Sequence, residues 1–145
     1  MTRAAPLLAL ALCAAALTAC GEKSEPEITG VNDDVQFEIT GGWKGELRQR
    51  KMKPFPVHAR IESLERSKQN TVRYGGEIDC AGTWEYLGVS ETAYRFREVI
   101  GGGRAGKCKG TGTVTLTPLA EDSVAYEFRG GGIHRAGDLT RAGSA

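Results

Sequence analysis

This sequence of 145 residues lacks the patterns that usually mark an enzyme, a metalloprotein or a nucleic-acid-binding protein. Its two histidines, His58 and His134, lie far apart and have no flanking pattern of carboxylates, so a zinc site is poorly supported. No serine lies in a nucleophile-elbow context, and no C-x-x-C redox pair is present. The 19 basic and 18 acidic residues nearly cancel, whereas nucleic-acid binding needs a strongly basic face. We therefore expect no catalytic residue, metal, cofactor or nucleic-acid partner.

The sequence also lacks an apolar run long enough for a comfortable membrane-spanning helix. Its longest apolar stretch, residues 4–18, follows the positive Arg3 and has about the length of a secretory signal. The stretch ends in the letters LTAC (residues 17–20). This ending resembles the lipobox of bacterial lipoproteins, in which the cysteine receives a diacylglycerol and becomes the first residue after cleavage. The alternative is an ordinary signal peptide with a chance cysteine near its cleavage site.

The lipobox interpretation divides the chain into three parts. Residues 1–19 are a lipoprotein signal peptide, residues 20–41 comprise the lipidated Cys20 and a polar tether, and residues 42–145 form a β domain. The mature protein is then expected on the extracytoplasmic face of the cell membrane, with the membrane as a partner through the lipid anchor. Because Arg3 is removed with the signal, the mature chain carries 18 residues of each sign.

Helical periodicity is nearly absent from the mature chain, and apolar residues recur at every second position instead. In residues 107–117, for example, Val114 and Leu116 face one way while lysine and threonine residues face the other. Residues 35–40 also alternate and are a candidate extra strand. Turn-forming stretches separate about eight such segments, at the spacing expected of a barrel or sandwich. We predict an all-β fold, an antiparallel meander of about eight strands forming a small barrel or sandwich.

Two of the four cysteines, Cys80 and Cys108, remain once the signal and the lipidated cysteine are set aside. In an oxidising extracytoplasmic space, such a pair is expected to form a disulfide. Both lie on apolar faces, at the end of one segment and the start of another, so both can lie at the same rim. The alternative, two free reactive thiols, is disfavoured because neither cysteine has a histidine nearby.

Glu98 is the most unusual residue, because it shares an apolar face with Tyr94, Phe96 and Ile100. A carboxylate in such a place is costly unless it is paired. Arg141 has the parity of the apolar face of the last segment, so the sequence suggests a buried ion pair between Glu98 and Arg141. The alternative is a functional carboxylate, either a ligand-binding group or a general acid with a raised pKa.

Basic residues are concentrated in residues 43–53, where Glu46 is the only acidic residue. The basic cluster consists of Lys44, Arg48, Arg50, Lys51 and Lys53. Near a membrane, such a cluster can contact anionic headgroups or anionic wall polymers. The alternative is a solvated hairpin tip, which is what most charge runs are.

Several spaced motifs occur together in the order of a known family. They are Trp43-x-Gly45, Val72-Arg73-Tyr74, Cys80-Ala81-Gly82, Phe96-Arg97-Glu98-x-Ile100, Cys108, Gly112-x-Val114-x-Leu116, Tyr126-Glu127-Phe128 and Leu139-Thr140-Arg141. Over about residues 42–141, the chain resembles a small β-rich extracytoplasmic module of actinobacteria. That module occurs in secreted proteins and lipoproteins and at the outer ends of some membrane Ser/Thr protein kinases. The resemblance implies a disulfide between Cys80 and Cys108 and no known ligand or catalytic residue. Since this sequence has no kinase domain, sensing through a kinase would need a partner.

The expected function is a non-catalytic binding or sensing module at the cell envelope. Its partner would be an unknown small ligand or an envelope protein. Seven aromatic residues could line an interior that holds a small apolar ligand: Trp43, Tyr74, Trp84, Tyr94, Phe96, Tyr126 and Phe128. They could equally form the core, because a small eight-stranded barrel is normally filled by its own side chains. The alternative function is a structural or inhibitory partner protein that acts through its surface on an envelope protein or an anionic wall polymer.

Overall fold

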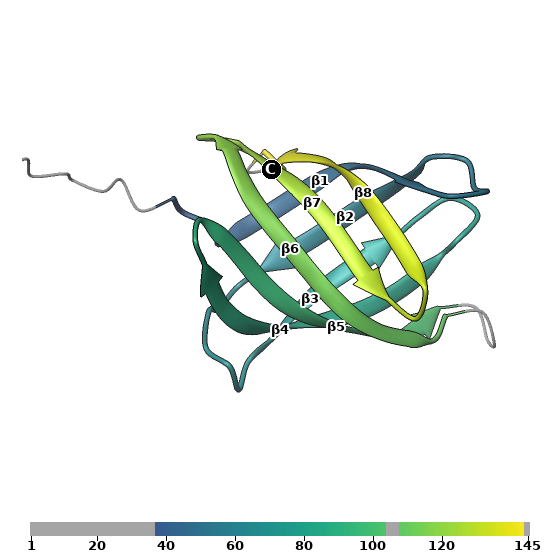
Figure 1. Ribbon diagram of the computed structural model, residues 1–145, viewed down its shortest axis with the longest axis horizontal. Helices are drawn as coiled ribbons and strands as arrows, with labels where there is room; N and C mark the ends of the chain where they lie inside the picture. Colours follow the sequence, from purple (N-terminus) through teal and green to yellow (C-terminus); the bar gives the residue numbers. More distant parts are fainter. Residues whose placement is uncertain (1–36, 104–107, 144–145) are drawn as a thin grey trace, which may run out of the picture. The chain divides into compact units, whose positions relative to one another are not determined.

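The computed structural model describes residues 37–103 and 108–143, in which eight strands close into a barrel (Figure 1). The strands are β1 (Gly41–Gln49), β2 (Phe55–Ile61), β3 (Gln69–Tyr74), β4 (Cys80–Ser90), β5 (Ala93–Gly103), β6 (Gly110–Ala120), β7 (Ser123–Gly130) and β8 (Ile133–Arg141). Each strand pairs antiparallel with the next, and β8 pairs with β1. The predicted all-β meander of eight antiparallel strands is confirmed, and it forms a barrel.

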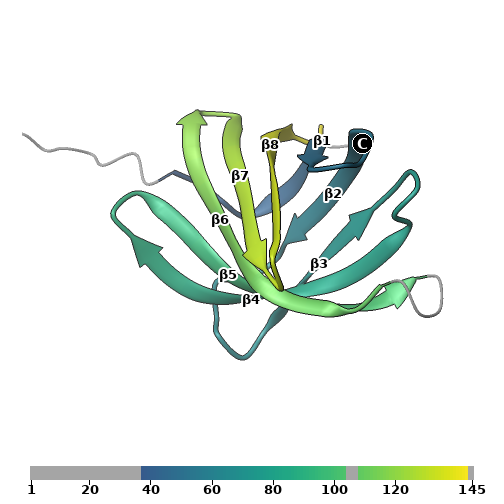
Figure 2. The same cartoon turned by 45° about the vertical axis from the view of Figure 1, so that its right-hand side comes forward.

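The alternation of apolar and polar residues decides which side chains point into the barrel. In β2, for example, Phe55, Val57, Ala59 and Ile61 are buried while the residues between them are exposed. The same alternation runs through β3 and β7. Figure 2 shows the strands wrapping around one interior. The period of two seen in the sequence therefore becomes an inner and an outer surface.

Large side chains fill the interior of the barrel. The largest fully buried apolar and aromatic ones are Trp43, Trp84, Tyr74, Tyr126, Phe55 and Phe96. Trp84 packs against Phe96 and Tyr126, with ring centroids 5.6 and 6.1 Å apart. All seven aromatic residues that the sequence offered as a ligand lining belong to this buried core. They fill the interior of the barrel, as expected for one of this size, and of the seven only Tyr74 also lines the mouth pocket described below.

Close packing of the interior requires a glycine on β6. A Cβ atom at Gly112 would lie 2.4 Å from the Phe128 ring and 2.7 Å from the carbonyl oxygen of Arg129. Real Cβ atoms do not approach other atoms so closely, and glycine in a strand often marks such an approach. The absence of a side chain at Gly112 thus leaves room for the Phe128 ring.

The segment before β1 packs against one end of the barrel. Ile39 is buried, and its carbonyl oxygen accepts a hydrogen bond from Trp43 Nε1 at 2.8 Å. The Tyr94 hydroxyl donates to the carbonyl oxygen of Phe37, also at 2.8 Å. The expected boundary at Gly42 is therefore too late, because the packed domain already includes residues 37–41. Within the candidate extra strand, residues 37–40 form no strand.

Candidate functional site

A buried polar network inside the barrel is centred on Glu98. This β5 residue is fully buried. Its Oε2 accepts hydrogen bonds from the Trp84 indole N–H at 2.7 Å and from the Tyr74 hydroxyl. Its Oε1 accepts a hydrogen bond from Arg135 Nη1 at 3.3 Å, which is also an ion pair. Glu98 is therefore paired and hydrogen-bonded, as a buried carboxylate must be to be tolerated.

Two tyrosine hydroxyls extend the network across the barrel. The hydroxyl oxygens of Tyr74 and Tyr126 lie 2.9 Å apart, and either can donate to the other. In the described part of the chain, every buried side-chain nitrogen and oxygen has a hydrogen-bond partner. The network thus connects interior side chains of β3, β4, β5, β7 and β8 in the satisfied state that buried polar groups usually show.

Burial shifts the protonation equilibria of the network. Loss of hydration raises the pKa of the Glu98 carboxyl above its ordinary value, and hydrogen bonds from Tyr74 and Trp84, together with the positive Arg135, oppose that rise. Burial also raises the pKa of both Tyr74 and Tyr126. Both tyrosines therefore remain neutral hydroxyls that can donate and accept hydrogen bonds.

The expected ion pair between Glu98 and Arg141 is wrong, because the buried partner of Glu98 is Arg135. Both arginines have the inward parity of β8, but six residues separate them, which is about 20 Å along an extended strand. Arg141 is paired in register with Trp43, and its guanidinium lies 4.7 Å from that ring. It donates to the main-chain carbonyl of Thr40. Alternation alone gives no register, so it could not separate the two arginines.

Arg135 is held between two aromatic rings at the edge of the core. Its guanidinium carbon lies 4.5 Å from the Phe128 ring centroid and 5.0 Å from that of Tyr74. Its Nε donates to Gln49 Oε1 at 2.9 Å. The side chain is 11% exposed. A positive group is thus fixed where the buried network meets solvent.

A pocket of about 380 Å³, here called the mouth pocket, opens at this end of the barrel. Its polar and charged lining residues are Gln49, Tyr74, Glu77, Lys109 and Arg135. Its apolar lining includes Met52, Ile78, Ile100 and Ile133, together with the two cysteines. Ligand pockets commonly have mostly apolar walls with a few placed polar groups, and the mouths of barrels are a frequent location. The mouth pocket is therefore the candidate ligand site.

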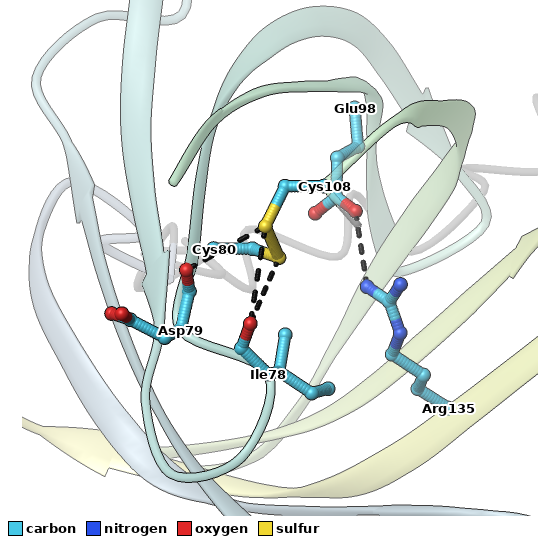
Figure 3. Close-up of a disulfide and its surroundings, with 6 residues drawn as sticks. All are labelled: Ile78, Asp79, Cys80, Glu98, Cys108 and Arg135. Carbon is cyan, nitrogen blue, oxygen red and sulfur yellow. Dashed lines mark hydrogen bonds and ion pairs between the residues drawn. A yellow bond between two sulfur atoms is a disulfide. The ribbon is translucent and has the colours of Figure 1, made fainter. Parts of the chain in front are cut away.

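The predicted disulfide is confirmed and lies in the wall of the mouth pocket. A covalent bond joins Cys80, at the start of β4, to Cys108, which precedes β6. Figure 3 shows the disulfide beside Ile78, with Glu98 and Arg135 nearby and the dashed ion pair between them. The rim location expected for the two cysteines therefore coincides with the end of the barrel where the pocket opens.

The predicted basic cluster is divided by the fold. Arg48, Arg50 and Lys51 line an open groove together with His134, next to the mouth pocket, with which it shares Gln49 and Ile133. The two remaining members lie elsewhere: Lys53 is 3.8 Å from Glu77, and Lys44 is exposed on β1 opposite His58. Three of the five basic residues thus form one positive surface, here called the basic groove.

The residues that the structure describes contain no group of three or more His, Cys, Asp or Glu side chains placed to hold a metal ion. Within the same residues, no helix is long and apolar enough to cross a membrane. Cys20 and the predicted signal peptide lie outside the described residues, so lipidation stays a prediction.

Comparison with known proteins gives no match, either to a protein-family model or to a curated protein. The resemblance to an actinobacterial extracytoplasmic module therefore also stays a prediction.

Proposed function

We propose that this protein is a lipid-anchored, extracytoplasmic binding or sensing module of the cell envelope, which binds a small molecule in the mouth pocket. The observation that carries the proposal is Arg135. The position of its guanidinium is fixed by Gln49, Glu98 and two aromatic rings in the lining of a pocket with mixed polar and apolar walls. Polar groups held in fixed positions beside apolar side chains are typical of ligand sites. We assign no catalytic role to Glu98, because a structural pairing explains its burial.

The lipid anchor rests on the sequence around Cys20. A lipidated Cys20 that is followed by polar, mostly acidic residues fits a protein tethered to the extracytoplasmic face of the cell membrane. The direct test is to express the full chain and its Cys20→Ala variant in the native host and to separate membranes from soluble protein. The native chain should sediment with membranes and carry an acylated N-terminal cysteine, which intact mass measures. An unmodified native chain would contradict the anchor.

Native mass spectrometry tests the binding role directly. The mature protein, with its disulfide intact, is purified from the envelope of its own host and released gently from detergent. A stoichiometric small molecule that is retained by the native protein and lost from an Ile133→Trp variant, which fills the pocket, would support the proposal. A bare protein mass, together with no binding in a screen of envelope metabolites, would contradict it.

The basic groove favours a second candidate, a partner protein that acts through its surface on an anionic polymer or an envelope protein. Arg48, Arg50 and Lys51 lie together there, and such a positive surface attracts anions in a salt-dependent manner. Binding of the non-lipidated mature chain to anionic liposomes or wall polymer, lost on Arg48→Glu and Arg50→Glu substitution, would support this candidate. Salt-independent or absent binding would exclude it.

A further inference from the structure

The guanidinium of Arg135 has hydrogen-bonding capacity beyond its bonds to Gln49 and Glu98. It donates from Nε to Gln49 and from Nη1 to Glu98, and its direct interaction with Tyr126 opposes the rise that burial causes in the pKa of that hydroxyl. An arginine carries five N–H groups in a planar fork, so about two remain for a further acceptor. Because Arg135 lines the mouth pocket, a ligand there can reach the guanidinium.

The charges around the mouth pocket favour an anion. Lys109 lies on the pocket lining, and the basic groove adjoins it with Arg48, Arg50 and Lys51. The one acidic residue on the pocket lining, Glu77, is paired with Lys53, whose Nζ lies 3.8 Å from its carboxylate. A positive rim around a concave site raises the local concentration of anions. An arginine fork suits a planar carboxylate in particular.

Glu98 is the obstacle to such an anion, because it already neutralises Arg135. Two carboxylates on one guanidinium repel each other, and the usual resolution is that one of them binds a proton. The ligand is open to water while Glu98 is fully buried, where hydration cannot stabilise its charge. The proton is therefore expected on Glu98.

We propose that the mouth pocket binds a small carboxylate with a short apolar body, which pairs with Arg135 while Glu98 takes up one proton from solvent. The proposal rests on the proposed binding function and names its ligand class. The proton forms an O–H bond on the Glu98 carboxylate, so the total charge of the site is unchanged when the anion enters. The apolar body of the ligand contacts Met52, Ile78 and Ile133 in the wall.

The groups that face Glu98 can accommodate its neutral form. They come from four other strands: Tyr74 of β3, Trp84 of β4, Tyr126 of β7 and Arg135 of β8. The Trp84 N–H can still donate to a carboxylic acid oxygen. The new O–H can donate to Tyr74, whose own hydroxyl then donates to Tyr126. Burial already raises the pKa of Glu98 above its ordinary value, which makes this protonation easier.

Isothermal titration calorimetry of the non-lipidated mature chain tests the proposal, with hexanoate as the probe and neutral hexanamide as its matched control. Hexanoate should bind at least about tenfold more tightly than hexanamide, a difference that one charged pair can supply. At about pH 8, repeated titrations in buffers of different ionisation enthalpy should show uptake of up to one proton per ligand. Equal binding of the two probes, or carboxylate binding without proton uptake, would overturn the proposal.

Two variants separate the roles of the charged groups. Glu98→Gln should bind hexanoate with no proton uptake, because glutamine cannot titrate. Arg135→Gln should lose the preference for hexanoate over hexanamide. Arg97→Gln, the same substitution on the outer surface of β5, should keep both the preference and the proton uptake. If Arg135→Gln does not fold, the number of protons taken up per bound hexanoate, compared between the native chain and Glu98→Gln, still tests the proposal.

The failure of this proposal is distinguishable from failure of the binding function. A neutral or cationic molecule retained in native mass spectrometry, with no hexanoate preference, would overturn the carboxylate and leave the binding module intact. No retained molecule and no binding of either probe would contradict both.

Discussion

Single residues in the buried network link stability to pH. Glu98 is fully buried, and burial raises its pKa in the folded chain relative to the unfolded chain. A carboxyl with a raised pKa binds protons more strongly when folded. Its contribution to stability is therefore fully present below the unfolded pKa and is lost as the pH rises through the folded pKa.

We therefore predict that Glu98→Gln changes the pH dependence of unfolding. As the pH rises from about 4.5, the ordinary value of the group, the native protein should lose stability relative to Glu98→Gln. Urea unfolding of both proteins across this range gives the difference curve. The pKa values of Glu38 and Glu127 are lowered by hydrogen bonds, which outweigh some desolvation. Both proteins contain these two residues, so their contributions to the pH dependence cancel in the difference curve. A difference that stays constant with pH would contradict the shift.

Gly112 gives a second prediction at the residue scale. In Gly112→Ala, the new Cβ would overlap the Phe128 ring and the Arg129 carbonyl, so we expect a loss of about 1–3 kcal/mol in the free energy of unfolding. Gly101→Ala is the matched control, because a Cβ there meets nothing within 4 Å, and it should change stability by less than about 0.5 kcal/mol. Equal effects of the two substitutions would contradict the close packing on β6.

At the scale of elements, the disulfide connects the start of β4 to the chain that enters β6. Because Cys80 and Cys108 are 28 positions apart in the sequence, the bond restricts a large loop of the unfolded chain. We predict that Cys80→Ser/Cys108→Ser loses about 3–4 kcal/mol in the free energy of unfolding, measured in urea. The native protein under reducing conditions should approach the same value. A reduced protein as stable as the oxidised one would show that the bond adds no stability.

Strands and their inner faces were predictable from the sequence, because one buried face imposes a period of two that the residues show directly. Glu98 was recognised for the same reason, as a charge among inward residues. The closure of β8 on β1 and the pairing of Glu98 with Arg135 were not predictable, since both depend on register between distant strands. Ile39 falls within the predicted tether of residues 20–41, although it is buried against the barrel end.

At the scale of the whole molecule, the two ends of the barrel chain lie side by side. The Ala142 amide donates to the Gly42 carbonyl at 2.9 Å, and Arg141 donates to that of Thr40. Chain ends so close together can be joined without disturbing the structure between them.

We predict that a circular permutant of the barrel folds. Residues 37 and 143 are joined by a short Gly/Ser linker, and the chain is opened between the exposed Glu91 and Thr92 in the turn from β4 to β5. This permutant should unfold in one cooperative transition, followed by circular dichroism in urea. A control opened between Arg97 and Glu98, within β5, should not fold. If the first permutant forms the Cys80–Cys108 disulfide but does not fold, the pairing of β1 with β8 is contradicted.

Closure of the sheet into a barrel limits the ways in which another protein can bind to it. A sheet with a free edge offers unpaired main-chain groups, to which another chain can add a strand or start an aggregate. In the described barrel, β1 and β8 pair with each other, so neither presents such an edge. Strand addition is thereby unavailable to a protein partner, which has to recognise side chains and loops. The closed sheet also keeps folded copies of the chain from pairing edge to edge.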